Sequence, residues 1–172
     1  MNGQAATHSA ERLLERFGVT GPPTDVEAIA AKLGFRIVYE QLGPEISGFL
    51  INKPGAPVIG VNSDQPPPRQ RLTIAHEIGH IQLRHTFEPG EFVHVDKRFE
   101  LYRDLAASEL PPRELEACWF AGALLMPPGF LRQEVARVGR TPLNDEEIQD
   151  LARRFDVSVQ GMTIRLSRLG LL

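Results

Sequence analysis

The chain has 172 residues, of which 42% are hydrophobic and 24% charged, and its net charge of −3 gives no general electrostatic reason to expect nucleic-acid binding. It contains no apolar run of about 18 residues and no apolar stretch near its start, so we expect neither membrane insertion nor secretion. Cys118 is the only cysteine, which excludes an intrachain disulfide and a thiolate-rich zinc site and favours a cytoplasmic location.

Two helices are predicted at the start of the chain. Apolar side chains recur at helical spacing from Ala10 to Phe17, and the glycine that follows is a favourable stop. Thr24 and Glu27 match the capping box of a second helix, which Gly34 ends. Both segments have one apolar face, as helices of a scaffold do.

A small sheet is predicted next. Apolar residues alternate with others at 35–39, and β-favouring runs follow at 49–51 and 58–61. Between the last two runs, Lys53-Pro54-Gly55 suits a tight turn, because proline fixes φ and glycine accepts a positive φ. We therefore predict a small, largely antiparallel three-stranded sheet within an α+β fold.

Helices dominate the rest of the chain. The three prolines at 66–68 can lead into a helix, and nothing except Gly79 breaks helical continuity from Arg69 to about Arg84. Residues 86–110 are predicted to be irregular, and a connection of that length is usually mobile or functional. Further helices are predicted from about Pro111 to Met126 and at about 129–138, 145–155 and 159–169, the last two capped by Asn144 and Ser158.

The predicted helix from Arg69 carries an HExxH motif at 76–80. Its two histidines are four residues apart, so both imidazoles lie on one face of a helix, where they can chelate a zinc ion. Glu77 is rotated by about 100° from His76, which lets it flank the metal and accept a proton from the attacking water. The composition predicts on the order of 0.01 accidental copies of the motif per chain, so the match is specific.

A third ligand is predicted on the helix that begins near Pro111. Glu114 shares a face with apolar Ala117 and Ala121, and a carboxylate that points into a core needs a partner such as a metal ion. The alternative is that Glu114 only stabilises the helix dipole from the first turn. Glu116 lies off this face and is predicted to meet water.

A further histidine, His85, follows the motif. It is nine residues after His76, which is roughly 180° around a continuing helix, so we predict a solvated residue at the helix end and not a ligand. Cys118 is predicted to be a small core residue, with approach to the metal as the alternative.

These segments resemble the ImmA/IrrE family of metallopeptidases, which are small zincins. HExxH preceded by Arg-Gln-Arg and followed by a helix ending in LLMP is a much more specific combination than HExxH alone. The resemblance covers most of the chain and rests on ISGFLIN (46–52), IGVN (59–62), RQRLTIAHEIGHIQLRH (69–85), ELEACWFAGALLMP (114–127) and FDVSVQGMTIRLSRLGLL (155–172).

The resemblance implies a minimal zincin-like α+β fold in which the HExxH helix packs with the sheet. It also implies a Zn²⁺ cofactor held by His76, His80 and Glu114, with Glu77 as the catalytic residue. The family pattern places an asparagine four residues after the glutamate, where this chain has Cys118. That departure changes a residue expected to hydrogen-bond to a zinc ligand and orient it.

The resemblance further implies that the substrate is a protein, namely a helix-turn-helix transcriptional repressor whose cleavage derepresses genes of a mobile element or a stress response. We expect a metallopeptidase core at 1–128 and a helix-turn-helix-like C-terminal region at 129–172 that packs on it. In the long connection, His94, Tyr102 and Arg103 are candidates for stabilising the oxyanion.

Two other functions remain open. Residues 148–169 have the pattern of two helices joined by a short turn. Residues 151–172 carry four arginines and one aspartate, a net charge of +3. Because the whole chain has a net charge of −3, the residues before 151 carry a net charge of −6. A DNA-binding or regulatory protein is therefore the alternative to an enzyme. The other possibility is a zinc ion with a structural or sensory role, although such a site needs no general base like Glu77.

Overall fold

The computed structural model describes residues 3–51, 53, 55, 57–85, 93–97 and 111–172. None of its helices has the length and apolar character that a membrane span requires. In chain order the elements are α1 (Gly3–Arg16), α2 (Val26–Lys32), β1 (Arg36–Glu40), β2 (Ile46–Ile51), β3 (Val58–Asn62), α3 (Pro67–Gln82), β4 (Val93–Lys97), α4 (Pro112–Leu125), α5 (Pro128–Val138), α6 (Asp145–Phe155) and α7 (Val159–Arg168).

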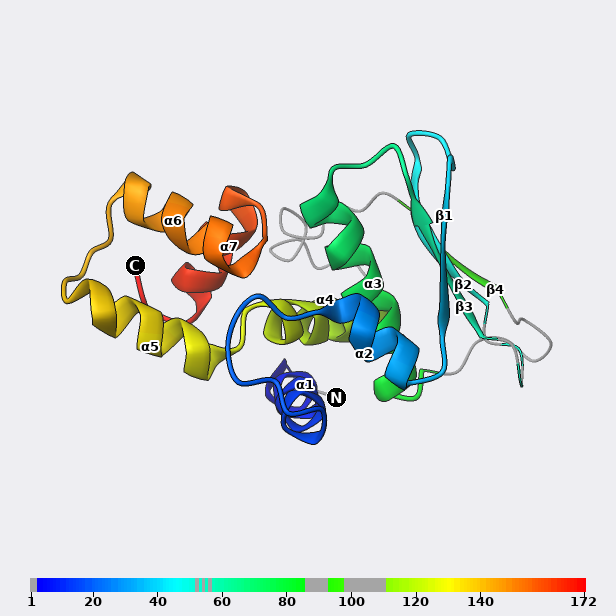
Figure 1. Ribbon diagram of the computed structural model, residues 1–172, viewed down its shortest axis with the longest axis horizontal. Helices are drawn as coiled ribbons and strands as arrows, with labels where there is room; N and C mark the ends of the chain where they lie inside the picture. The colour runs from blue at the N-terminus through cyan, green and yellow to red at the C-terminus, as the bar shows by residue number, and fades with distance from the viewer. Residues whose placement is uncertain (1–2, 52, 54, 56, 86–92, 98–110) are drawn as a thin grey trace.

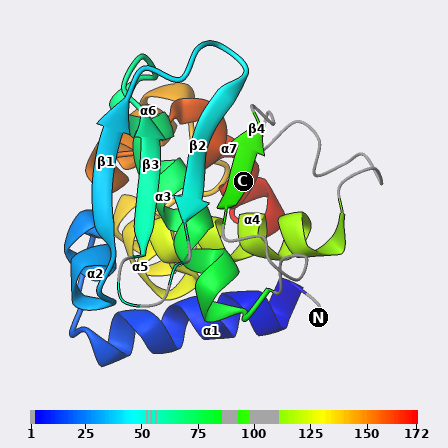
Figure 2. The same cartoon turned by 90° about the vertical axis from the view of Figure 1, so that its right-hand side faces the viewer.

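The sheet has four strands in the order β1-β3-β2-β4, and it corrects the prediction of three largely antiparallel strands. Strand β3 lies between β1 and β2, as the view of the sheet in Figure 2 shows. Ile59 of β3 is paired in parallel with Ile37 of β1 and antiparallel with Leu50 of β2. The parallel pair arises because the chain reverses direction twice between β1 and β3, so that these two strands run the same way.

Strand β4 lies within the segment that was predicted to be irregular. It pairs antiparallel with β2, where His94 is opposite Leu50. The sequence signal of β4 is weak, because it has only five residues, VHVDK, and three of them are polar. Short strands with polar side chains are typical of sheet edges, and β4 is the edge next to β2.

Helix α3 lies between the sheet and α4, and α1 crosses below α4 (Figures 1 and 2). The C-terminal helices α5, α6 and α7 lie on the side of α4 that is remote from the sheet. The largest buried side chains come from the sheet and from helices on both sides of α4, and they form one core; they include Ile29, Leu50, Ile59, Ile74, Ile78, Phe120, Leu124 and Phe155.

Helix α2 begins differently from the prediction. Its N-cap is Asp25, whose side chain accepts a hydrogen bond from a backbone N–H in the first turn at 2.9 Å. Thr24 donates instead to the carbonyl oxygen of Leu124 on α4 at 2.9 Å, and Glu27 accepts from the hydroxyl of Tyr39. The capping-box prediction was wrong because both side chains have partners elsewhere in the fold.

Two arginines form polar contacts between the C-terminal helices and the preceding helices. Arg71 of α3 donates to the carbonyl oxygen of Asp156 at 3.0 Å and forms an ion pair with its carboxylate at 3.1 Å. Arg165 of α7 donates to the carbonyl oxygen of Met126, at the end of α4, at 3.1 Å. Both contacts join segments far apart in sequence. The division into a core at 1–128 and a C-terminal region at 129–172 stays a prediction.

Gly48 of β2 lies against Thr73 of α3, and we expect Gly48→Ala to lower the free energy of unfolding by about 1–3 kcal/mol. A Cβ at this position would lie 2.4 Å from the carbonyl oxygen of Gly60 and 2.5 Å from a methyl group of Thr73. Gly122 within α4 is the control, because nothing lies within 4 Å of a Cβ there.

Gly122→Ala should raise the free energy of unfolding by about 0.5–1 kcal/mol, since alanine favours the helix over glycine. Urea unfolding of both variants measures the two effects. A Gly48→Ala protein as stable as the wild type would show that the sheet and α3 are not packed as described.

Candidate metal centre

Helix α3 places the HExxH motif in the interior of the protein. The helix begins at Pro67, where the missing N–H of proline costs nothing, and it continues through the motif to Gln82. The side chains of His76, Glu77 and His80 are all completely buried, with 0% of their surface exposed. Polar groups in such a setting require partners, because water cannot solvate them.

Helix α4 approaches α3 closely at the glycine of the motif. A Cβ on Gly79 would lie 3.1 Å from the ring of Phe120 and 3.2 Å from the carbonyl oxygen of Ala117, so a larger residue here would require these neighbours to shift. The close packing brings the first turn of α4 to the HExxH residues. Glu114 in that turn is 4% exposed and points inward, as its position on the apolar face predicted.

Three side-chain atoms of His76, His80 and Glu114 form a small triangle. The two Nε2 atoms are 3.0 Å apart, and each is 3.3 Å from Oε2 of Glu114. Four ligands arranged tetrahedrally around zinc, at the usual bond lengths, are separated from each other by about 3.3 Å. The spacing of these three atoms therefore fits one face of a zinc coordination tetrahedron, and the donor set of two imidazoles and one carboxylate fits it chemically.

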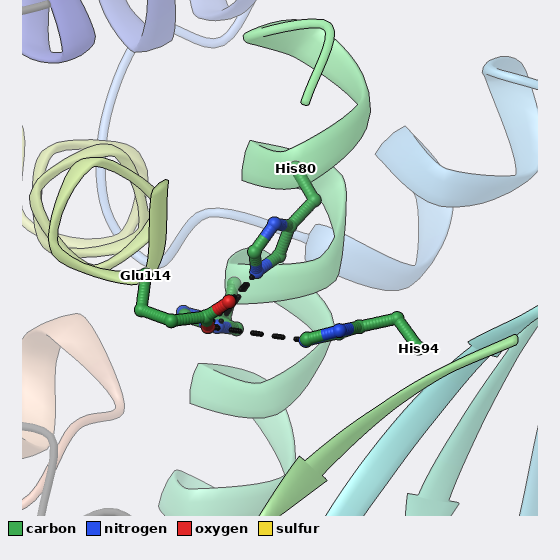
Figure 3. A group of neighbouring side chains, drawn as sticks. His80, His94 and Glu114 are labelled. Carbon is green, nitrogen blue, oxygen red and sulfur yellow. Dashed lines mark hydrogen bonds and ion pairs between the residues drawn. The ribbon is translucent and has the colours of Figure 1, made fainter. Parts of the chain in front are cut away.

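His94 approaches the same triangle from strand β4. Its Nε2 atom is 3.8 Å from Oε2 of Glu114, and Figure 3 shows the side chains of His80, His94 and Glu114 converging from three different elements. A group of ligand atoms that could hold a metal ion comprises His76, His80, His94 and Glu114, all within 4.8 Å of one another. Glu77 is outside this group, which agrees with a role other than ligation.

Burial and mutual contact set the charges of these groups. Burial lowers the pKa of His80 to about 4, against a smaller opposing effect of Glu114, so the ring is neutral at pH 7 and offers a nitrogen lone pair. Burial would raise the pKa of Glu114, but the hydrogen bonds with His76 and His80 hold it well below its usual range. Neutral imidazoles beside an ionised carboxylate are the forms that bind a metal cation.

The family model of the IrrE N-terminal-like domain, which describes a peptidase family, matches residues 30–167. This chain belongs to the IrrE N-terminal-like peptidase family. The match confirms the resemblance inferred from the motifs, and it includes the helix with HExxH, strand β4 and the helix with Glu114. The peptidases of this family are metal-dependent, in agreement with a buried group of His and Glu ligands.

The fold is similar to that of solved structures. One of these is a Mycobacterium tuberculosis transcriptional regulator with a TM-score of 0.63 and 20% sequence identity, and the match covers 95% of this chain. It covers 46% of the regulator, so this chain spans about half of that protein. At this level of identity the likeness concerns the fold alone. No curated protein matches the chain in sequence.

The residue at the family's asparagine position contacts a motif histidine from behind. Cys118 of α4 is 6% exposed, and its Sγ lies 3.8 Å from Nδ1 of His76, the ring nitrogen that faces away from the triangle. The thiol is therefore a neighbour of His76 and takes no place among the grouped ligand atoms. The alternative that Cys118 approaches the metal is not supported by this geometry.

Two predictions about neighbouring residues were wrong. His85 and Glu116 were both expected to meet water, but their side chains are 8% and 9% exposed and bind each other through Nε2 and Oε2 at 3.1 Å. The prediction assumed that the helix continues to residue 85, whereas α3 ends at Gln82 and Arg84 has a positive φ of 55°. Of the oxyanion candidates only His94 can be placed, because Tyr102 and Arg103 lie outside the described residues.

Proposed function

We propose that the chain is a zinc-dependent endopeptidase in which His76, His80 and Glu114 hold the metal and Glu77 is the general base. The triangle of ligand atoms, with edges of 3.0, 3.3 and 3.3 Å, carries this proposal. Membership of a peptidase family supports it independently. Three protein ligands leave a coordination position for water, as catalytic zinc sites do and structural zinc sites do not.

Bound zinc would polarise the scissile carbonyl group and lower the pKa of the attacking water to about 7. Glu77 is completely buried next to His76, so its carboxylate is shielded from bulk solvent. One of its oxygens takes the proton as the water oxygen bonds to the carbonyl carbon. The same oxygen then gives the proton to the amide nitrogen as the C–N bond breaks, which balances the hydrolysis.

His94 has a separate place in this proposal. Its distance of 3.8 Å from Glu114 exceeds the edges of the triangle, and it comes from the edge strand and not from the two ligand helices. A ring at this position can donate a hydrogen bond to the carbonyl oxygen of a substrate as negative charge develops there. We therefore assign His94 to stabilisation of the oxyanion and not to permanent ligation.

The substrate we propose is a specific helix-turn-helix transcriptional repressor. The proposal rests on the family resemblance, and the occurrence of a similar fold within a transcriptional regulator is compatible with a regulatory role. A general protease would instead need a catalytic site that is fully formed before any substrate binds. Substrate binding that completes the site restricts cleavage to one partner.

Incubation of the purified protein with casein and with the repressor encoded nearest to its gene, each with and without a chelator, tests the proposed substrate. We expect a single chelator-sensitive cleavage of the repressor and no degradation of casein, measured by gel electrophoresis and intact mass. Rapid degradation of casein with an intact repressor would identify a general protease. No cleavage of either protein by a zinc-loaded sample would contradict the proposed activity.

The alternative of DNA binding through α6 and α7 is less well supported, because acidic partners neutralise part of the arginine charge. Arg153 forms an ion pair with Asp150, and Arg154 forms one with Glu134 at 3.1 Å. Arg165 is engaged with α4. Phosphate binding depends on cationic side chains that are available to the nucleic acid, and these contacts reduce their number.

A further inference from the structure

A chain of buried side chains leads away from the metal triangle on its far side. Nδ1 of His80 lies 3.0 Å from Nδ1 of His85, and Nε2 of His85 lies 3.1 Å from Oε2 of Glu116. We propose that His85 and Glu116 are positioning residues that fix the tautomer of His80, so that its Nε2 lone pair points at the metal. This inference rests on the proposed metal site but concerns residues outside its ligand set.

The carboxylate of Glu116, the last side chain in this series, sets the direction of the hydrogen bonds. An ionised carboxylate only accepts, so Glu116 requires a proton on Nε2 of His85. A neutral imidazole with its proton on Nε2 can only accept at Nδ1, and Nδ1 of His80 must then donate to it. The contact with His85 therefore favours the tautomer of His80 with its proton on Nδ1, which leaves Nε2 with the lone pair that a metal requires.

On the opposite side, Glu114 favours the other tautomer when no metal is bound. Its Oε2 lies 3.3 Å from Nε2 of His80 and can accept a proton held there. The ring of His80 thus stands between two carboxylates, Glu114 directly and Glu116 through His85. The link through His85 supplies the preference for the metal-binding form.

The backbone builds this arrangement at the end of α3. The N–H of Arg84 donates to the carbonyl oxygen of Ile81 at 3.1 Å, and the N–H of His85 donates to that of His80 at 3.0 Å. Together with the positive φ of Arg84, this is a Schellman motif, in which the chain turns back over the last helical turn. The turn places the ring of His85 against His80 instead of on the far face of the helix.

Helix α4 supplies the carboxylate that binds His85, because Glu116 is on this helix, two residues after Glu114. One helix therefore provides both a ligand and the carboxylate that orients another ligand. A purely structural tie between α3 and α4 would need only the contact between His85 and Glu116. The additional contact of His85 with Nδ1 of His80 is what links the pair to the metal site.

The test uses Glu116→Gln, which keeps the size of the side chain but lets it donate as well as accept. We expect its zinc affinity, measured on the full chain by competition with a chromogenic chelator, to fall roughly 10–100-fold, the usual effect of removing a partner behind a ligand. Glu134→Gln is the matched control, because Glu134 on α5 is likewise buried and ion-paired but lies among the C-terminal helices. Its zinc affinity should equal that of the wild type.

Two variants of His85 separate the mechanism from a loss of packing. His85→Leu removes the acceptor and should reduce zinc affinity as Glu116→Gln does, whereas the side-chain oxygen of His85→Asn can occupy the place of Nδ1 and should restore part of it. In the metal-free protein, ¹⁵N NMR of the imidazoles should show the Nδ1–H tautomer of His80 in the wild type and a smaller fraction of it in Glu116→Gln.

Folded Glu116→Gln and His85→Leu proteins with wild-type zinc affinity would overturn the proposal, as would reduced affinity with an unchanged tautomer of His80. A wild-type protein that binds no zinc would contradict the proposed function. The tautomer measurement on the metal-free protein would then still decide whether His85 and Glu116 orient His80.

Discussion

Glu77→Gln should lower the rate of repressor cleavage by roughly 10²–10⁴-fold while the protein keeps its metal and its fold. Glutamine has nearly the size of glutamate, so the completely buried position is filled as before. Its amide cannot accept the proton of the attacking water at neutral pH. Because Glu77 is outside the group of ligand atoms, the substitution leaves the zinc-binding set intact.

The cleavage rate is measured under single-turnover conditions, and the zinc content of each sample is measured by elemental analysis. Glu134→Gln serves again as control, since it replaces another buried glutamate and should cleave at the wild-type rate. Wild-type cleavage by a pure Glu77→Gln sample would remove Glu77 from the mechanism. Zinc loss in this variant would instead make Glu77 a ligand.

His80→Ala should abolish stoichiometric zinc binding, with a loss of affinity larger than the roughly 10–100-fold expected for a partner behind a ligand. The substitution removes one vertex of the triangle and leaves two of the three proposed ligands, His76 and Glu114. Two protein ligands make a weak zinc site, because catalytic sites use three. Dialysis against a weak chelator followed by elemental analysis measures the effect.

His8→Ala is the matched control for this experiment. His8 is an exposed histidine on α1, and its loss should leave the zinc content at one ion per chain. The two variants together distinguish the HExxH site from adventitious binding to surface imidazoles. Full zinc occupancy in His80→Ala would disprove the assignment of the ligands.

The ligand triangle could be predicted because each of its members follows from helical periodicity. His76 and His80 share a helix face at a spacing of four residues, and Glu114 shares one with small apolar residues. Both arguments need only the local sequence and one continuous helix. The structure places these three side chains within 3.3 Å of one another, although their part in binding a metal stays a proposal.

The positions of His85 and Glu116 could not be predicted by the same reasoning. His85 departs from helical phase because Arg84 adopts a positive φ, and an arginine gives no sequence signal for that conformation, whereas the glycines that end α1 and α2 do. Glu116 is off the apolar face of α4, and the returning ring of His85 gives it a partner that helical periodicity alone does not predict.

The sheet was incompletely predicted for two physical reasons. Strand order depends on contacts between distant segments, so the hairpin of β2 and β3 was accessible from the sequence while the parallel pairing of β1 with β3 was not. Strand β4 has polar side chains and a low strand propensity of its own, and it forms because it pairs with β2. The position of His94 beside the ligand triangle therefore depends on tertiary structure and could not be predicted from the local sequence.

Anomalous scattering at the zinc absorption edge, from crystals of the purified protein, tests the central claim most directly. The account predicts one zinc peak per chain at about 2.0–2.2 Å from Nε2 of His76, Nε2 of His80 and a carboxylate oxygen of Glu114, with His94 beyond bonding distance and a position open to water. A zinc ion bound elsewhere, or one closed by His94 as a fourth protein ligand, would contradict an open catalytic site.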